Sequence, residues 1–307
     1  MRLLVTGAAG FIGRHVLAQA NAAGIDLVGI GRTRPPSMSR SAFIESDLLR
    51  DEVRVEQLAA LRPTDLLHLA WVTTPGEYWQ SPLNEHWGDA TARLVETFFR
   101  AGGEHVVGAG SCAEYAWRGA PCVEDNTPLQ PATPYGRAKH NAHLRVSQLA
   151  AAYQRHYCWA RLFLLYGAGE ASRRLVPSVV ASLRGEAPPV PIGLSLARDL
   201  LHVDDAASAL LHLVQAKVTD AINVCAGHAT QLSTLVHLAA RLLDADPAPL
   251  LARARTPRPD EPATLTGDNT RLCATGWRPR VSLARGLAAS IESRVVTPTT
   301  ADLFLEC

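Results

Sequence analysis

A tyrosine and a lysine four residues apart are the pair best suited to do chemistry in this sequence. They are Tyr135 and Lys139, in the segment PYGRAK, and this spacing puts both side chains on one face of a helix. A free tyrosine has a pKa of about 10, and a nearby ammonium stabilises the phenolate and lowers that pKa. Ser111 follows a predicted strand upstream of this pair and can bond the same carbonyl oxygen. The sequence therefore predicts a catalytic site made of Ser111, Tyr135 and Lys139.

Three glycines near the start of the chain predict a site for the phosphates of a dinucleotide. Gly7, Gly10 and Gly13 lie in LLVTGAAGFIG, between an apolar strand and an amphipathic helix. Glycines here allow a tight turn, close approach of the backbone to a pyrophosphate, and close packing of helix on strand. The helix N-terminus adds free N–H groups and the positive end of a dipole. The predicted cofactor contacts are Gly7, Gly10, Phe11, Ile12, Gly13, Leu48, Leu69 and Ala70, together with Tyr135 and Lys139.

The end of the second predicted strand favours NADP(H) over NAD(H). An NAD site usually carries Asp or Glu there, to hold the ribose 2′-hydroxyl, whereas this chain has Arg32 and Arg34 in GIGRTRP. Guanidinium groups suit a 2′-phosphate because they form paired, charge-assisted hydrogen bonds. The alternative is that both arginines are solvated surface residues, and NAD(H) then remains the cofactor. Asp47 is predicted to bond the adenine amino group or, alternatively, to cap a helix.

Short apolar runs alternate with helical patterns through the first half of the chain. Strands are predicted at 3–6, 27–30, 66–69, 105–109 and 159–165, and helices at 11–22, 84–100 and 134–156. Such alternation is typical of βαβ units in a parallel sheet covered on both faces. Right-handed crossovers make that sheet doubly wound. We therefore expect an α/β fold with a doubly wound Rossmann sheet. Asn84, at the start of a predicted helix, is interpreted as its N-cap rather than as a contact near the nicotinamide.

After residue 166 the pattern changes, because prolines break the alternation and cluster again at 247–262. The predicted cofactor domain covers residues 1–166 and returns at roughly 200–225, with a helix at 204–215. A smaller lobe on the sheet's C-terminal edge is predicted at 167–199 and 226–295. Residues 296–307 are predicted to be a loose tail.

Composition excludes several classes of protein. The formal net charge of +1 and the scattered Lys and Arg residues predict no nucleic-acid or membrane partner. No apolar run approaches the roughly 20 residues of a membrane helix, and a strand pattern that begins at Arg2 leaves no room for a signal peptide. The six cysteines contain no C-x-x-C pair, so neither a metal site nor a disulfide framework is expected. These features predict a cytoplasmic protein with free thiols.

The motifs TGAAGFIG, LLHLAW, GAGSCAEY, PYGRAK, RLFLLYG, RDLLHVDD and GWRP resemble those of the extended short-chain dehydrogenases/reductases, in particular the nucleotide-sugar epimerase/dehydratase group. The resemblance covers nearly the whole chain. It implies a sheet of about seven strands, a C-terminal lobe that binds a nucleotide-sugar, and a homodimer through helices near 90–100 and 135–155. It also implies that Arg198 and Arg258 contact the substrate diphosphate. Thr73, Cys112 and Glu114 are expected to line the sugar pocket.

Departures from the family's motifs narrow the expected reaction. Cys112 and Ala113 stand where the 4,6-dehydratases carry Asp and Glu, so elimination of water is not expected. Ala113 and Arg174 stand where the fucose-synthase-like epimerases/reductases carry Cys and His. Leu164 replaces the Asn that many relatives carry. The resemblance then implies an NADPH-dependent reductase of a nucleotide-linked 4-keto-6-deoxy sugar, similar to the CDP-abequose synthase group. An NAD-dependent nucleotide-sugar 4-epimerase and a non-catalytic NADP sensor are the alternatives.

Overall fold

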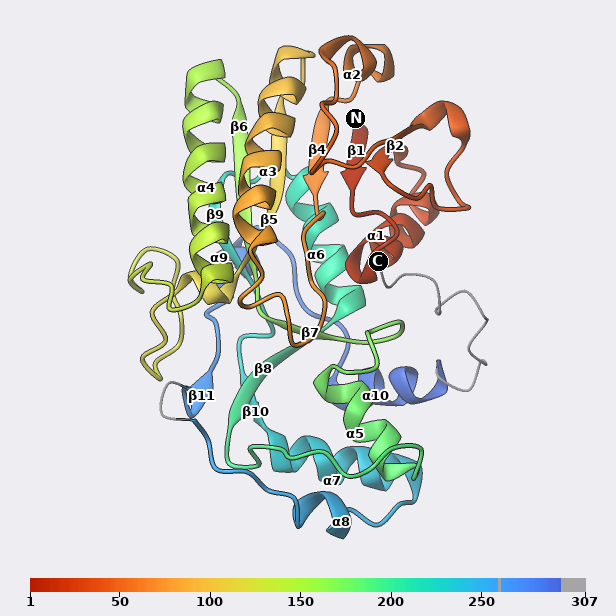
Figure 1. Ribbon diagram of the computed structural model, residues 1–307, viewed down its shortest axis with the longest axis vertical. Helices are drawn as coiled ribbons and strands as arrows, with labels where there is room; N and C mark the ends of the chain where they lie inside the picture. The colour runs from red at the N-terminus through yellow and green to blue at the C-terminus, as the bar shows by residue number, and fades with distance from the viewer. Residues whose placement is uncertain (259–260, 294–307) are drawn as a thin grey trace.

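A seven-stranded sheet forms the upper part of the molecule in this computed structural model, which describes residues 1–258 and 261–293 (Figure 1). Its strands are β1 (Arg2–Thr6), β2 (Asp26–Gly31), β3 (Phe43–Glu45), β4 (Asp65–His68), β5 (His105–Ser111), β6 (His156–Leu162) and β9 (Asp220–Val224). They lie in the order β3-β2-β1-β4-β5-β6-β9, and all neighbouring pairs are parallel. The strand order reverses direction between β1 and β4, where a doubly wound sheet opens a crevice at the carboxyl ends of its strands. The predicted Rossmann sheet is confirmed.

Helices cover both faces of this sheet because each strand is apolar on both sides. Successive residues of β1 show this, since Leu3 and Val5 join one apolar cluster and Leu4 joins the other. The first cluster lies against α1 (Phe11–Ala22) and α6 (Val203–Gln215). The second lies against α2 (Val55–Leu61), α3 (Leu83–Arg100) and α4 (Pro134–Tyr153).

A smaller lobe with its own sheet and core lies below the main sheet (Figure 1). In this sheet β8 (Ala197–His202) pairs with β7 (Leu164–Tyr166), β10 (Ala229–Gln231) and β11 (Thr264–Leu265). Its helices are α5 (Leu175–Leu183), α7 (Leu232–Leu243), α8 (Ala248–Leu251) and α10 (Leu283–Glu292). Two short 3₁₀ helices, η1 (Arg40–Ala42) and η2 (Cys112–Glu114), and the helix α9 (Thr270–Ala274) complete the described elements. None of the described helices is long and apolar enough to cross a lipid bilayer.

Two predicted boundaries around β6 were wrong. The long helix was predicted to reach His156, but it ends at Tyr153 because Gln154 adopts the left-handed conformation (φ 53°, ψ 47°), and His156 already begins β6. The predicted strand at 159–165 is two strands, with Phe163 between them, and the second one pairs with β8 in the smaller lobe.

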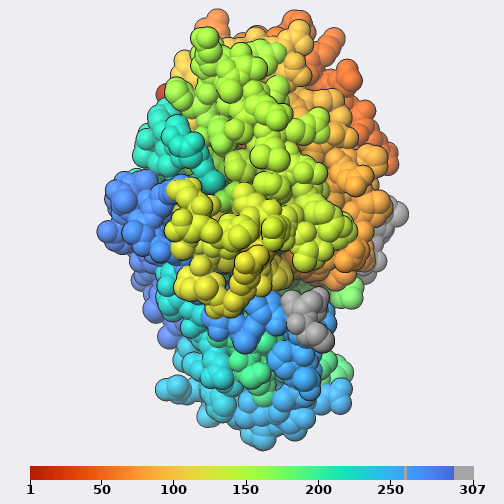
Figure 2. Space-filling model, turned by 90° about the vertical axis from the view of Figure 1, so that its left-hand side faces the viewer, coloured from red at the N-terminus to blue at the C-terminus, as the bar shows by residue number. Residues whose placement is uncertain are grey.

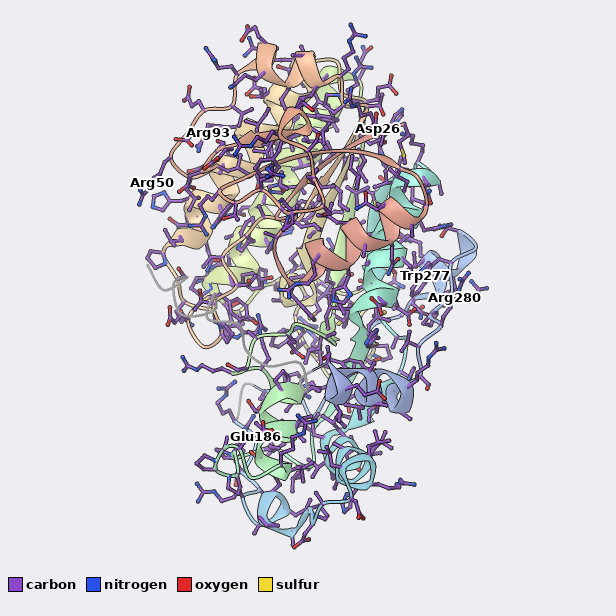
Figure 3. The ribbon with its side chains drawn as sticks, turned by 90° about the vertical axis from the view of Figure 1, so that its right-hand side faces the viewer. Asp26, Arg50, Arg93, Glu186, Trp277 and Arg280 are labelled. Carbon is purple, nitrogen blue, oxygen red and sulfur yellow. The ribbon has the colours of Figure 1, made fainter. Side chains whose placement is uncertain are left out.

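The chain returns to the main sheet again near its C-terminus. The Trp277 indole donates to the Ser208 hydroxyl of α6 at 2.9 Å, and the backbone N–H of Arg280 donates to Asp205 (Figure 3). Leu272 and Trp277 belong to the core cluster of the main sheet, although the predicted lobe included them. The division into domains stays a prediction, and the predicted tail at 296–307 lies outside the described residues.

Candidate active site

The glycine turn after β1 is shaped by backbone contacts that leave no room for side chains. Gly7 has a φ of +67°, and a Cβ there would lie 2.8 Å from the Ala70 nitrogen. A Cβ on Gly13 would lie 2.1 Å from the Gly7 carbonyl oxygen, while the Gly10 N–H donates to that same oxygen at 3.0 Å. The turn therefore presents the N-terminus of α1, beginning at Phe11, at the carboxyl edge of the sheet. This cradle fits a dinucleotide pyrophosphate.

The end of β2 carries the predicted arginines. Arg32 is exposed directly after Gly31, the last residue of the strand. Arg34 donates to the Met38 carbonyl. The Asp47 carboxylate accepts the Leu49 N–H at 3.1 Å, which shows a turn contact beyond β3 and leaves the adenine contact a prediction.

Ser111 and Tyr135 meet at the end of β5. Ser111 is the last residue of that strand, and its side chain lies near enough to that of Tyr135 to favour the phenolate, although burial outweighs this and raises the Tyr135 pKa. Tyr135 lies in the first turn of α4, which begins after Thr133 because the Thr133 hydroxyl accepts the Gly136 N–H at 3.0 Å. The Tyr135 N–H donates to the Trp79 carbonyl at 3.2 Å. The structure thus brings the predicted serine and tyrosine together.

The Lys139 ammonium contacts a backbone carbonyl and an indole ring. Its Nζ donates to the Ala109 carbonyl at 2.8 Å and lies 3.6 Å from the centroid of the Trp71 ring. Burial lowers the pKa of Lys139 to about 7. The pKa of Tyr135 is raised by burial and, less strongly, by the neighbouring Tyr78. The predicted lowering of this pKa is therefore absent from the structure, because the ammonium is held by a carbonyl and an indole face.

Aromatic residues between β4 and α3 were missed as part of the site. Tyr78 contacts the Tyr135 ring edge to face, with centroids 4.9 Å apart, and Trp79 does so at 5.5 Å. The dense aromatic sequence PGEYW was the available signal. Asn84 was wrongly interpreted as an N-cap, since Pro82 holds that position, and the Asn84 side chain instead bonds the indole of Trp71.

Glu114 has partners inside the protein, and its predicted contact with the sugar stays a prediction. Its side chain is fully buried, and it accepts hydrogen bonds from the Ser111 N–H at 2.7 Å and from the Trp159 indole at 2.9 Å. It also forms an ion pair with Arg161 at 3.1 Å. These hydrogen bonds and this ion pair to the carboxylate all come from β5 and β6. Cys112, next to it, is buried, and burial raises the pKa of its thiol.

A possible set of metal ligands lies beside this ion pair, although the sequence predicted no metal site. Ligand atoms of Glu114, His140 and His143 lie within 4.8 Å of one another. Arg161 pairs with Glu114, and its Nη2 lies 3.4 Å from His143 Nδ1. The guanidinium therefore already supplies the positive charge that a cation would bring.

The predicted diphosphate contact of Arg198 stays a prediction. Its side chain is buried and forms an ion pair with Glu261 at 3.2 Å. Its Nη1 also donates to the carbonyls of Ala197 and Pro262 at 2.8 and 3.0 Å. A diphosphate would have to share or replace these partners. Arg258 is exposed nearby, where its N–H donates to Glu261.

The segment between η2 and α4 covers the junction of the main sheet and the smaller lobe. It is the yellow band in Figure 2, below the green surface of α4. The Cys122 N–H donates to the Thr266 carbonyl at 2.9 Å, which attaches this segment to the chain after β11.

The thiols of the five cysteines that the structure describes are free.

The profile of the NAD dependent epimerase/dehydratase family matches residues 3–225. The chain belongs to this family. Members of the epimerase/dehydratase family resemble it along most of its length, and the matched range holds the glycine turn, Ser111, Tyr135 and Lys139.

Similar proteins carry out more than one reaction. A 3-diazoavenalumate denitrifying reductase of a Streptomyces species is 27% identical, over 91% of this chain and 96% of that protein. A GDP-6-deoxy-D-mannose reductase of Pseudomonas aeruginosa is 26% identical, over 96% of this chain and 98% of the relative. The solved structure of MoeE5 in complex with UDP-glucose and NAD is similar to this chain, with 28% sequence identity and a TM-score of 0.79. The match covers 95% of this chain and 98% of the MoeE5 chain. UDP-glucose 4-epimerases are also among the relatives. Membership of the family therefore leaves both the substrate and the reaction to the chemistry of the site.

Proposed function

We propose that this protein is an NADPH-dependent reductase that converts a nucleotide-linked 4-keto-6-deoxy sugar to the 4-hydroxy sugar. The surroundings of Tyr135 carry this proposal. Beside Ser111, the Cys112 thiol is buried and the Glu114 carboxylate is paired with Arg161. We take neither as a base that removes a proton from carbon. Tyr135 at the end of β5, near Ser111, supports hydride addition to a carbonyl with a single proton transfer.

In the proposed reaction Tyr135 donates its hydroxyl proton to the oxygen of the substrate carbonyl, and Ser111 donates a hydrogen bond to the same oxygen. A reduced nicotinamide cofactor, when bound at the glycine turn, supplies the hydride for the carbonyl carbon. Lys139 is proposed to stabilise the resulting phenolate, which then regains a proton from water.

NADPH is the proposed cofactor because positive side chains follow β2. Arg32 is exposed there and is free to reach a 2′-phosphate. The Asp47 carboxylate is used by a turn. NAD, which the similar MoeE5 binds, is the alternative.

A panel of substrates tests the proposal. Purified protein is mixed with NADPH and 4-keto-6-deoxy sugars linked to dTDP, CDP, GDP or UDP, and the absorbance of the reduced nicotinamide is followed. Oxidation of NADPH with one linked sugar, absent in Tyr135→Phe, supports the proposal. Interconversion of UDP-glucose and UDP-galactose without a net absorbance change identifies a 4-epimerase instead. Reduction of 3-diazoavenalumate alone removes the nucleotide-sugar from the proposal. Binding of NADPH without any turnover identifies a sensor.

The substrate contacts of Thr73, Cys112, Arg198 and Arg258 stay predictions, as does the homodimer. Arg198→Ala is expected to raise the KM for the linked sugar by about 10- to 100-fold, the equivalent of a charged hydrogen bond. The control substrate is the same keto sugar without its nucleotide diphosphate. Equal turnover of the free and the nucleotide-linked sugar by the native enzyme would contradict a diphosphate contact.

A further inference from the structure

The chain between β4 and α3 packs an aromatic side chain against each of the two residues on the catalytic face of α4. Trp71 lies over the Lys139 ammonium, and Tyr78 lies edge to face on Tyr135 at an interplanar angle of 88°. Tyr78 is only 8% exposed. The ring of Tyr78 therefore limits the positions open to the Tyr135 ring, and the proposed reaction gives Tyr78 no role of its own.

One asparagine holds both aromatic contacts in place. Asn84 Nδ2 donates to the Tyr78 carbonyl at 2.7 Å, and Asn84 Oδ1 accepts from the Trp71 indole at 2.9 Å. Asn84 is 1% exposed, so water competes little for these bonds. The backbone of Tyr78 is thereby fixed relative to Trp71 and to the start of α3.

An arginine of the smaller lobe holds the other end of Tyr78. Arg174, the residue before α5, donates from Nη1 to the Tyr78 hydroxyl at 3.5 Å, and its Cζ lies 5.0 Å from the centroid of the Tyr78 ring. Its Nη2 donates to the Thr73 carbonyl at 3.2 Å. A guanidinium keeps its charge at any working pH, so this contact with the hydroxyl persists wherever the enzyme is active.

We propose that Tyr78 is a positioning residue for Tyr135, and that Arg174 sets the position of Tyr78 from the smaller lobe. The proposal rests on the proposed function, in which Tyr135 is the proton donor. Proton and hydride transfer require close alignment, and a misplacement of about 1 Å can cost about a hundredfold in rate. The N–H of Tyr135 is fixed by the Trp79 carbonyl, whereas its ring is fixed by side-chain packing, to which Tyr78 contributes.

Four variants separate the ring of Tyr78 from its hydroxyl. Tyr78→Leu removes the ring, and we expect kcat to fall about a hundredfold while the KM for NADPH changes less than about twofold. Tyr78→Phe and Arg174→Gln both remove the hydroxyl contact, and each is expected to lower kcat about tenfold, as for one hydrogen bond to a charged group. Their combination should lose no more than Arg174→Gln alone, because Arg174→Gln already removes the hydroxyl contact.

A matched control removes another aromatic ring from the same helix. Tyr153, at the far end of α4, packs on Phe99, and Tyr153→Leu should keep the kcat of the native enzyme. A native kcat in Tyr78→Leu, an equal loss in Tyr153→Leu, or a loss confined to the KM for NADPH would overturn the positioning role. Tyr78→Phe and Arg174→Gln keep the test decisive if Tyr78→Leu does not fold.

A measurement without substrate separates this inference from the proposed function. The chain has six tyrosines, so 3-fluorotyrosine labelling gives a simple fluorine NMR spectrum in which Tyr135→Phe assigns the Tyr135 signal. A single narrow Tyr135 signal is expected in the native protein and in Tyr78→Phe, and a broadened or split one in Tyr78→Leu. An unchanged signal in Tyr78→Leu overturns the inference even in an active enzyme. A split signal in a protein that reduces no keto sugar upholds the positioning of Tyr135 and rejects the proposed function.

Discussion

The carboxyl edge of the main sheet and the sheet of the smaller lobe both hold residues singled out in the sequence, but they use them differently. At the main edge, Gly7 and Ser111 lie where β1 and β5 end, and the backbone alone brings them to one side of the sheet. In the smaller lobe, Arg198 lies in β8, and its charge is paired with Glu261, 63 residues later in the chain. The position of a residue at the end of a strand can be predicted from the spacing of elements in the sequence. Whether a charged side chain is free to bind a ligand depends on partners far away in the sequence.

The largest effect on turnover is expected from substitution of Tyr135, the proposed proton donor at the carboxyl edge of the main sheet. Tyr135→Phe should lower kcat by about 10²- to 10⁴-fold, the usual contribution of a general acid, and leave NADPH binding nearly intact. Adding Lys139→Met should cost little more, because residues that act as a unit are not additive. Steady-state kinetics and fluorescence titration with NADPH measure both quantities. Full activity in Tyr135→Phe would show that this edge is not catalytic.

A smaller effect is expected where backbone alone decides the geometry. Gly13→Ala places a methyl group 2.1 Å from the Gly7 carbonyl oxygen, and overpacking of this kind costs about 3 kcal/mol. We expect NADPH affinity to fall about a hundredfold, as measured by fluorescence titration. Gly88→Ala is the control, because its Cβ would lie in ordinary contact, 3.8 Å from the Ala138 carbonyl oxygen. Unchanged affinity in Gly13→Ala would mean that the turn does not bind the cofactor.

In the smaller lobe, removal of a charged partner is expected to lower the stability of the protein. Glu261→Gln leaves Arg198 and Arg255 without their shared carboxylate, and breaking this partly buried network should cost about 2 kcal/mol, between the values for exposed and buried pairs. The free energy of unfolding in urea should fall by that amount. The control is Asp89→Asn, which breaks an exposed pair with Arg145 and should cost less than about 1 kcal/mol. Equal losses in the two variants would mean that Glu261 contributes no more than a surface pair.

The most selective effect is expected at the end of β2. Arg32→Ala should weaken NADPH binding by about 1.5–3 kcal/mol, the value of a charged hydrogen bond, and leave NADH binding almost unchanged. Competitive titration with both cofactors measures the difference. An equal loss for the two, or tighter binding of NADH by the native protein, would reject the preference for the 2′-phosphate.

Local patterns were enough to predict the parallel sheet, the glycine turn and the meeting of Ser111 with Tyr135. Alternating apolar runs specify which segments are strands, and the residue at a strand end needs no distant partner to reach the carboxyl edge. The end of α4 could not be predicted in this way. The helix ends because Gln154 adopts the left-handed conformation, and the spacing of apolar residues does not reveal that conformation.

Tertiary contacts alone decided how the charged and aromatic side chains are used. Lys139 turns to Ala109 and Trp71, and Glu114 pairs with Arg161 across 47 residues of chain. Burial removes water as a partner, so each of these charges takes the nearest acceptor or counter-charge that the fold supplies. The sequence by itself determined which elements carry the proposed catalytic side chains, and the packing around these side chains determined which partners they have in the folded protein.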